Sequence, residues 1–426
     1  MGQSELKVSI KRRGQRWAFL SSATLIFFLC SSNLHLPRES TALINVAEAA
    51  DLDETCSEMM GSSSANLPVP AGGDILPVRS VWDPYPSLHS IAVDTTNNQV
   101  VMTDSNRGSL LFYGRTSGNG SAEMVTPQRQ VRGPATGMMF IAGVALDPAE
   151  REVFAVNNDI GDRMEVFSYE ADGNAKPKRV LFVPHGSWGI SLDKERGEVA
   201  ISVEHIHSVV VYRRDATNGD APLRVIRGAQ TGLADPHGIA FDVTNHEILV
   251  ANHGNWAPLT SEEASAGNQL RGGHFQPPSI ITLPAAAQGD AAPTRSIQGE
   301  RTQLNWPMGI AVDTAHNEVA VANYGNNSIL IFRKTDTGDV APVRMIQGDQ
   351  TGILAPMGVA IDIKNDELWV TNYRDHSAVV FPRDAQGNVT PKRILRNAPA
   401  GTPAVGFGNP GAVAYDTKRR EILVPN

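Results

Sequence analysis

Six histidines and one glutamate interrupt the pattern of this chain in a way that points to metal or acid–base chemistry. Histidine is the commonest metal ligand and titrates near neutral pH. Two imidazoles and a carboxylate suit Zn²⁺ or another transition metal, and the three residues that we would choose are Glu204, His237 and His253. The remaining members of the group are His185, His205, His207 and His274.

A metal ion held there would polarise a carbonyl group or activate water, with a neighbouring histidine as general base. The alternative is that these histidines hydrogen-bond to loop carbonyls, because no HExxH-like spacing marks a metal site. No serine-nucleophile motif, phosphate-binding loop or paired-carboxylate motif competes with these interpretations. The sequence therefore identifies no catalytic residue, and a divalent metal is the one cofactor that its residues would suit.

A repeated unit must position these side chains. In its clearest copy, residues 306–348, the apolar runs GIAVD, EVAVA, SILIF and PVRMI alternate with turn-rich segments, which predicts four antiparallel strands. An aspartate that closes the first strand recurs seven times, at Asp94, Asp147, Asp193, Asp242, Asp313, Asp362 and Asp416. The Pro-x-Arg motif of the fourth strand also recurs seven times, at spacings of 50, 50, 45, 71, 49 and 49 residues. This period and strand number are typical of an all-β propeller.

The two ends of the chain determine the predicted number of blades. The N-terminal segment GDILPVRSVWD precedes any first-strand motif and offers a third and a fourth strand, whereas the C-terminal GAVAYD and EILVPN offer a first and a second. Pairing these strands would complete a seventh blade and remove the exposed edges of an open array. We therefore predict a seven-bladed propeller over residues 62–426, with a six-bladed ring and loose ends as the alternative.

In a propeller, the loops that enter the first strands and leave the second strands share one face, here called the top face. They would form a funnel over the central channel, in which aromatic side chains supply stacking area. The ligand-binding candidates are His89, Trp188, His205, Trp256, His274, Met308, Tyr324, Met357 and Tyr373. A column of asparagines that closes the second strands is expected to cap turns. An insertion in blade four, residues 255–278, is a candidate lid because long loops in compact domains tend to be functional.

The N-terminal residues 1–50 have the features of a secretory signal peptide. A basic region is followed by AFLSSATLIFFL, which is short for a bilayer span, and by a candidate cleavage site at Ala47-Glu48-Ala49. We expect export to the periplasm or the cell exterior, with an uncleaved anchor as the alternative, and a flexible leader over residues 51–61. The exported chain would keep one cysteine, Cys56, and so form no internal disulfide.

The charge of the chain bears on its partners. The formal net charge is −8, and no basic run remains after residue 50, which argues against nucleic acid or an anionic membrane as the main partner. A small molecule, a peptide or a partner protein at the top face fits this composition better.

The phrases P-x-G-I-A-x-D, x-E-[VIL]-x-V-x-N and S-I-x-[VI]-F resemble NHL-repeat propellers, which are loosely grouped with gluconolactonase-like and streptogramin-lyase-like propellers. The resemblance covers residues 62–426 and implies a fold, but such propellers include both enzymes and binding platforms. Gluconolactonase-like enzymes hold a divalent metal partly through a carboxylate of the first blade, where this chain has His89. We therefore expect an exported ligand- or protein-binding module. The alternative is a lactonase-like, metal-dependent hydrolase or lyase with a His/Glu site in blades three and four.

Overall fold

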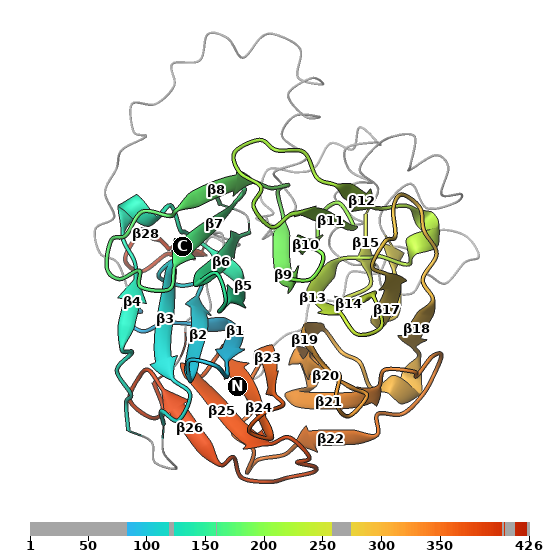
Figure 1. Cartoon of the computed structure of the whole chain (residues 1–426). Helices are drawn as coiled ribbons and strands as arrows, with labels where there is room; N and C mark the ends of the chain where they lie inside the picture. Colours follow the sequence, from blue (N-terminus) through green and yellow to red (C-terminus); the bar gives the residue numbers. More distant parts are fainter. Residues whose placement is uncertain are drawn as a thin grey trace, which may run out of the picture. The chain divides into compact units, whose positions relative to one another are not determined.

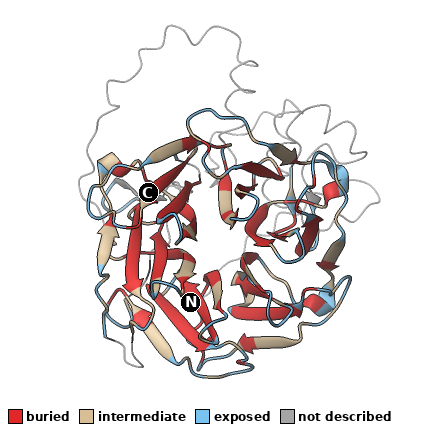
Figure 2. Ribbon diagram, viewed as in Figure 1, coloured by how far each residue is buried: buried red, intermediate tan, exposed pale blue. Residues whose placement is uncertain are grey.

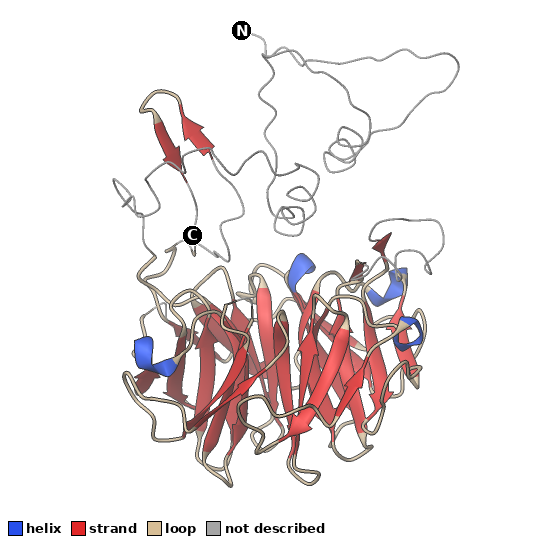
Figure 3. Ribbon diagram, turned by 90° about the horizontal axis from the view of Figure 1, so that it is seen from above, coloured by secondary structure: helices blue, strands red, loops and turns tan. Residues whose placement is uncertain are grey.

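The computed structural model describes residues 83–118, 123–158, 160–257, 274–402, 404 and 414–423. Within them, six four-stranded antiparallel sheets surround a central channel (Figure 1). From the side, their strands run between two faces of loops (Figure 3). The predicted all-β propeller is therefore confirmed. Among the described residues, no helix is both long and apolar enough to cross a membrane.

Each blade places its first strand at the channel and its fourth at the outer edge. Blade one comprises β1 (Leu88–Asp94), β2 (Gln99–Asp104), β3 (Ser109–Gly114) and β4 (Arg129–Val131). Blade two comprises β5 (Ile141–Asp147), β6 (Glu152–Asn157), β7 (Arg163–Ser168) and β8 (Arg179–Phe182). Blade three comprises β9 (Ser187–Asp193), β10 (Glu198–Val203), β11 (Ser208–Arg213) and β12 (Arg224–Ile226). Blade four comprises β13 (Pro236–Asp242), β14 (Glu247–Asn252), β17 (Ser279–Pro284) and β18 (Arg295–Gln298).

Blades five and six follow the same order. They comprise β19 (Pro307–Asp313), β20 (Glu318–Asn323), β21 (Ser328–Arg333) and β22 (Arg344–Gln347), then β23 (Pro356–Asp362), β24 (Glu367–Asn372), β25 (Ser377–Pro382) and β26 (Arg393–Arg396). Short 3-10 turns, η2 (Pro134–Thr136), η3 (Ala229–Thr231), η4 (Glu300–Thr302) and η5 (Tyr324–Asn326), lie in the connections. In the blade-four insertion, β15 (Asn255–Trp256) pairs with β16 (His274–Phe275), and residues 258–273 between them lie outside the described residues.

The hydrophobic core lies between the blades. Strands such as β3 and β10 are buried almost throughout, as their continuous apolar runs predict (Figure 2). The cluster between blades two and three, for example, joins Val156 and Met164 to Ile201 and Val210. Each of the six buried clusters spans one pair of neighbouring blades. A single sheet cannot bury both of its faces, so closing the ring covers the blades that an open array would leave exposed.

The prediction of seven blades closed by the termini is wrong, and the six-bladed alternative holds. Innermost strands β1 and β23 contact each other directly, and one core cluster joins Leu88 and Met102 of blade one to Trp369 and Val380 of blade six. The C-terminal β27 (Ala414–Asp416) and β28 (Glu421–Leu423) pair with each other in a two-stranded sheet. They belong to a different compact unit from the ring, which lies within residues 76–408. The signal peptide, the leader and the N-terminal strands expected before residue 83 lie outside the described residues.

A column of small residues allows the innermost strands of the ring to approach one another closely. On the innermost strands the column consists of Ser90, Gly143, Gly189, Gly238, Gly309 and Gly358. A Cβ atom placed on Gly238 would lie 2.1 Å from the carbonyl oxygen of Met308, and one on Gly358 would lie 2.7 Å from that of His89. These strands approach as closely as their backbones allow, including between the last blade and the first. The repeated unit therefore closes the ring without a strand from either terminus.

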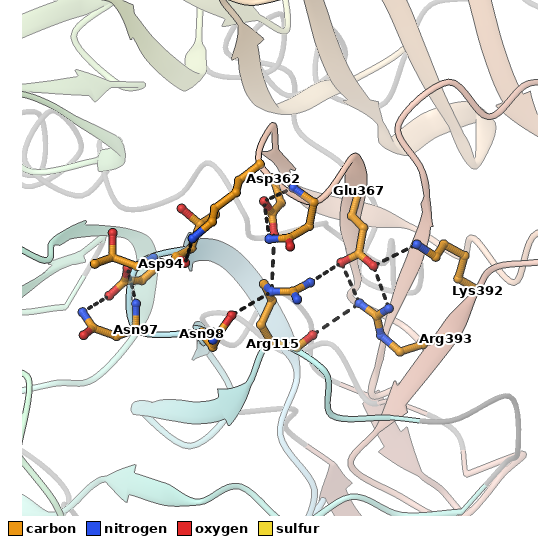
Figure 4. A network of polar contacts seen from close by, with 12 residues as sticks. Asp94, Asn97, Asn98, Arg115, Asp362, Glu367, Lys392 and Arg393 are labelled. Atoms are coloured by element: carbon orange, nitrogen blue, oxygen red, sulfur yellow. Dashed lines mark hydrogen bonds and ion pairs between the residues drawn. The ribbon is translucent and has the colours of Figure 1, made fainter.

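An ion-pair network supports the junction of blades six and one (Figure 4). The Arg115 guanidinium of blade one lies 3.6 Å from a carboxylate oxygen of Asp362 and 2.9 Å from one of Glu367 in blade six. Glu367 also binds Arg393 and Lys392 of its own blade, at 2.7 and 3.0 Å. Arg214 makes equivalent contacts, at 3.0 Å to Asp147 and 3.1 Å to Glu152, between blades three and two. The closing junction thus uses the same contacts as an internal one.

Candidate functional site

The top of each blade is formed by two residues that a main-chain hydrogen bond holds together. One, the entering residue, lies two positions before the channel-facing residue of the first strand. The other, the leaving residue, follows the second strand and donates its N–H to the carbonyl oxygen of the entering residue. The six pairs are Ser87/Ser105, Phe140/Asn158, Gly186/Glu204, Asp235/His253, Trp306/Tyr324 and Ala355/Tyr373, with N···O distances of 2.9–3.1 Å. Each blade therefore presents two adjacent residues on the top face, and all of them except Gly186 carry a side chain.

Local backbone geometry fixes these pairs. The asparagine that closes the second strand holds the entering loop: Asn252 accepts a hydrogen bond from the N–H of Ala234 and donates one to the carbonyl of Gly232. This column of asparagines is therefore structural. Entering residues Asp235, Trp306 and Ala355 have positive φ angles of 56°, 51° and 50°. Such a conformation is an outlier for a residue as bulky as tryptophan, and strained residues cluster at functional sites.

A β-bulge orients the channel-facing residues. In blade four the register of β13 against β14 shifts between Pro236 and Ile239, which brackets His237. The channel beneath, lined in part by His89, Ala142, Trp188 and Met357, has a volume of about 80 Å³. That volume holds several water molecules but is far below the roughly 300 Å³ of the smallest usual ligand pockets. The channel is therefore too small to enclose a ligand of that size.

A cluster of two histidines and two carboxylates dominates the rim. The imidazole rings of His237 and His253 stack with centroids 3.6 Å apart and an interplanar angle of 18°. Each Nδ1 atom lies 3.6 Å from a different carboxylate oxygen of Asp235. On the other side, Nε2 of His237 lies 3.2 Å from Glu204, and Nε2 of His253 lies 2.9 Å from the sulfur of Met308. Both imidazoles are 5% exposed and the Asp235 side chain 19%, so solvent reaches the cluster past the aspartate.

The charges of the cluster compensate one another. Burial alone would lower the pKa of His237, but the hydrogen bond to Glu204 and the charge of Asp235 outweigh it, and the pKa is raised. Burial tends to raise the pKa of Glu204 and of Asp235, yet their contacts with the histidines leave both values lowered. The pKa of His253 falls to about 4 because of its burial and the charge of His237. The two carboxylates thus favour the protonated form of His237, whereas burial favours the neutral form of His253.

Aromatic side chains extend the cluster around the rim. Trp188 lies between His89 and His237, with ring centroids 4.9 and 4.4 Å away. On the other side, Trp306 lies 5.1 Å from His253 and 6.3 Å from Tyr324. Trp306 is half exposed, so part of this aromatic surface faces solvent. We call this group of six side chains the aromatic rim: His89, Trp188, His237, His253, Trp306 and Tyr324.

Most residues that we selected from the sequence come together on the rim. Glu204, His237 and His253 share one cluster, and the ligand candidates His89, Trp188, Met308, Tyr324, Met357 and Tyr373 lie around it or in the apolar cluster beneath. His205 is half exposed and lies 3.2 Å from Glu204.

Two selected residues lie on the insertion instead of the rim. Trp256 stacks on His207, with ring centroids 5.9 Å apart, and in the backbone it pairs with His274. Nothing is described of the His274 side chain, so its assignment as a ligand-binding residue remains a prediction.

The sequence interpretation missed two central residues, Asp235 and Trp306. Both occupy the entering column, which we did not consider because the repeat was aligned on the channel-facing residues. The available signal was a residue directly before proline, as in Asp235-Pro236, Trp306-Pro307 and Ala355-Pro356. Since three blades share it, that pattern would have revealed a third column of top-face side chains.

Comparisons with known proteins carry no argument about the function of this chain. No protein-family model matches the sequence, and no curated protein matches it. Among solved structures, a chain of the nidogen/laminin complex is 15% identical over 72% of this chain and 95% of that chain, with a TM-score of 0.43. A functionally unknown protein from Desulfotomaculum acetoxidans is 15% identical over 79% and 88%, with a TM-score of 0.46. Kuenenia stuttgartiensis hydrazine synthase is 11% identical over 82% and 98%, with a TM-score of 0.49.

Proposed function

We propose that the chain is an exported binding module whose top face receives a segment of a partner protein or a peptide. The observation that carries the proposal is the position of exposed large apolar side chains. Nine such side chains are exposed among the described residues, and five of them lie in top-face loops: Met139, Ile160, Phe275, Trp306 and Leu354. A concentration of exposed apolar side chains on one face favours an interaction site there.

The shape of the site favours a peptide over a small molecule. The channel is too narrow to enclose a ligand, so contact must be made across the rim. Half-exposed Trp306 and the exposed Phe275 supply the aromatic area that usually dominates protein–protein binding energy. Arg374, whose guanidinium lies 5.8 Å above the ring of Tyr324, adds a polar group at the edge of this surface.

The proposal is tested by selecting peptides from a display library on the purified full chain. We expect the selected peptides to bind Trp306→Ala at least about 10-fold more weakly, since buried aromatic anchors contribute about 2 kcal/mol or more. Phe182→Ala is the matched control, because Phe182 is equally exposed but lies on the outer strand β8. Affinity would be measured by fluorescence polarisation, and thermal unfolding would verify that both variants fold.

Two results would refute the proposal. One is a set of peptides that bind Trp306→Ala as tightly as the unaltered chain. The other is an equal loss of affinity in Phe182→Ala, which would place binding at the outer edge of the ring.

Two finer aspects of the proposal rest on the sequence. Export is supported by the basic and apolar segments of residues 1–50, and membership of the NHL-repeat propellers by the repeated phrases of the blades. The second hypothesis, a lactonase-like hydrolase or lyase, requires a bound metal ion. It therefore depends on whether the histidine cluster binds a cation.

A further inference from the structure

The histidine cluster has the ligand atoms of a metal site. Ligand atoms of Asp235, His237 and His253 all lie within 4.8 Å of one another. Two imidazole nitrogens and a carboxylate oxygen form a set that Zn²⁺ binds at about 2.0–2.2 Å, with a further position left for water. Small side-chain rotations would bring the three groups to that distance. The side from which solvent reaches Asp235 is available for the remaining position.

The outer nitrogen of each imidazole is already occupied. Nε2 of His237 faces Glu204, whose carboxylate accepts a hydrogen bond of 3.0 Å from Asn158. Nε2 of His253 faces the sulfur of Met308. Both Nδ1 atoms face Asp235: that of His253 lies 3.6 Å from the carboxylate, and that of His237 also contacts the Asp235 carbonyl oxygen at 3.1 Å, a contact that a bound ion would replace. Metal-binding histidines usually direct their second nitrogen to a carboxylate in this way.

Charge balance also favours a bound dication. The Glu204 side chain is 9% exposed and the Asp235 side chain 19%, so two carboxylates lie largely out of solvent beside the two imidazoles. Two negative charges and two neutral imidazoles would be neutralised completely by one divalent cation. Buried charges are tolerated when they are paired or coordinate a metal.

We propose that Asp235, His237 and His253 bind a divalent transition-metal ion, with Zn²⁺ as the best match to two nitrogens and one oxygen. Glu204 orients His237 and does not bind the ion. This assignment replaces Glu204 of the set chosen from the sequence with Asp235. It goes beyond the peptide-binding proposal and does not rest on it.

The experiment is a titration of the untagged, chelator-treated full chain with ZnCl₂ by calorimetry and with CoCl₂ by visible absorption. We expect one ion per chain and the visible bands of low-symmetry Co²⁺. Asp235→Asn and His253→Gln should each weaken binding at least about 100-fold through loss of a ligand. Glu204→Gln should weaken it by about 10- to 100-fold and retain the Co²⁺ bands, as expected for a positioning residue.

The matched control is His316→Gln, which removes a histidine paired with Asp313 outside the cluster and should leave the titration unchanged. Asp235→Asn should fold, because asparagine tolerates the positive φ angle at this position. The proposal is overturned if the unaltered chain takes up no ion, or if Asp235→Asn binds as tightly as the unaltered chain. Loss of the Co²⁺ bands in Glu204→Gln with their retention in Asp235→Asn would restore Glu204 as the ligand and also overturn it. Trp306→Ala should still bind one ion, so failure of the peptide proposal is recognised separately.

Discussion

Glu165 on β7 should make the stability of the propeller depend on pH. Its side chain is fully buried, one oxygen accepts a 2.6 Å hydrogen bond from Asn157, and the other makes no hydrogen bond with the described residues. The nearest cation, Arg163, lies 3.8 Å away. Burial raises the pKa of Glu165 from 4.5 to about 9, and the charge of Arg163 opposes the rise. The folded protein therefore holds a neutral carboxylic acid at pH 7.

The sign and size of the effect follow from proton binding. Between pH 5 and pH 8 the unfolded chain loses the Glu165 proton while the folded protein keeps it. The folded state then binds one more proton, so stability falls as pH rises. At 1.36 kcal/mol per pH unit, the loss from pH 5 to pH 8 reaches about 4 kcal/mol. Glu165→Gln, which mimics the neutral acid, should remove this loss.

Urea unfolding at pH 5, 6, 7 and 8 measures the difference between the unaltered chain and Glu165→Gln. All other titrating groups contribute equally to the pH dependence of both proteins, so their contributions cancel in the difference in unfolding free energy. We expect the glutamine variant to gain stability relative to the unaltered chain with each step in pH. Glu195→Gln, in the exposed turn between β9 and β10, should follow the unaltered chain. If the free energy of unfolding changes with pH in parallel for the unaltered chain and Glu165→Gln, the reasoning is refuted. Such a result would mean that Glu165 is ionised in the folded protein.

Two further predictions concern closure of the ring. Gly238→Ala would place a methyl group 2.1 Å from the Met308 carbonyl oxygen. Urea denaturation should show that this lowers the free energy of unfolding by about 3 kcal/mol. An unchanged free energy would show that the inner strands can separate. Arg115→Met removes the cation shared by Asp362 and Glu367 and should lower the free energy of unfolding by about 2 kcal/mol. The loss is smaller than for a fully buried ion pair because Arg393 and Lys392 still bind Glu367. Arg213→Met, which breaks an exposed pair with Asp215, is its control and should leave the free energy of unfolding essentially unchanged. Equal losses in the two arginine variants would contradict the role given to Arg115.

The repeated apolar runs of the sequence predict the strands of each blade correctly, but they do not determine how many blades form the ring. Periodic apolar runs report which segments form strands, and the six blades have the predicted strand order. The seventh motif, ending at Asp416, matches the repeat but belongs to the separate hairpin β27–β28. The number of blades in a ring depends on how closely innermost strands approach. Gly238 lies against Met308, and Gly358 lies against His89. These residues are far apart in sequence, so counting the repeats does not reveal their contacts.

The candidate site was predicted in part. Glu204, His237 and His253 were selected because they break the repeat on one face, and they lie together. Their relative roles were not predictable, because these depend on which nitrogen of each imidazole faces which carboxylate. Asp235 was overlooked because the repeat was aligned on the channel-facing residues. The N–H of His253 donates a hydrogen bond to the carbonyl oxygen of Asp235, and this bond holds the two residues side by side.

Among the described residues, the chain runs directly from each blade to the next except from blade six to blade one, so that junction is the place where mechanical load would act first. Tension between the ends of the ring would be carried by individual non-covalent links. Examples are the 2.6 Å hydrogen bond from Thr371 to the carbonyl oxygen of His89 and the 2.8 Å hydrogen bond from the N–H of Val125 to the carbonyl oxygen of Arg396. Once these links part, whole blades can detach in succession, each still intact as a sheet. A propeller built in this way yields in steps of one blade, whereas one fastened by strands from both termini must break a sheet before it opens.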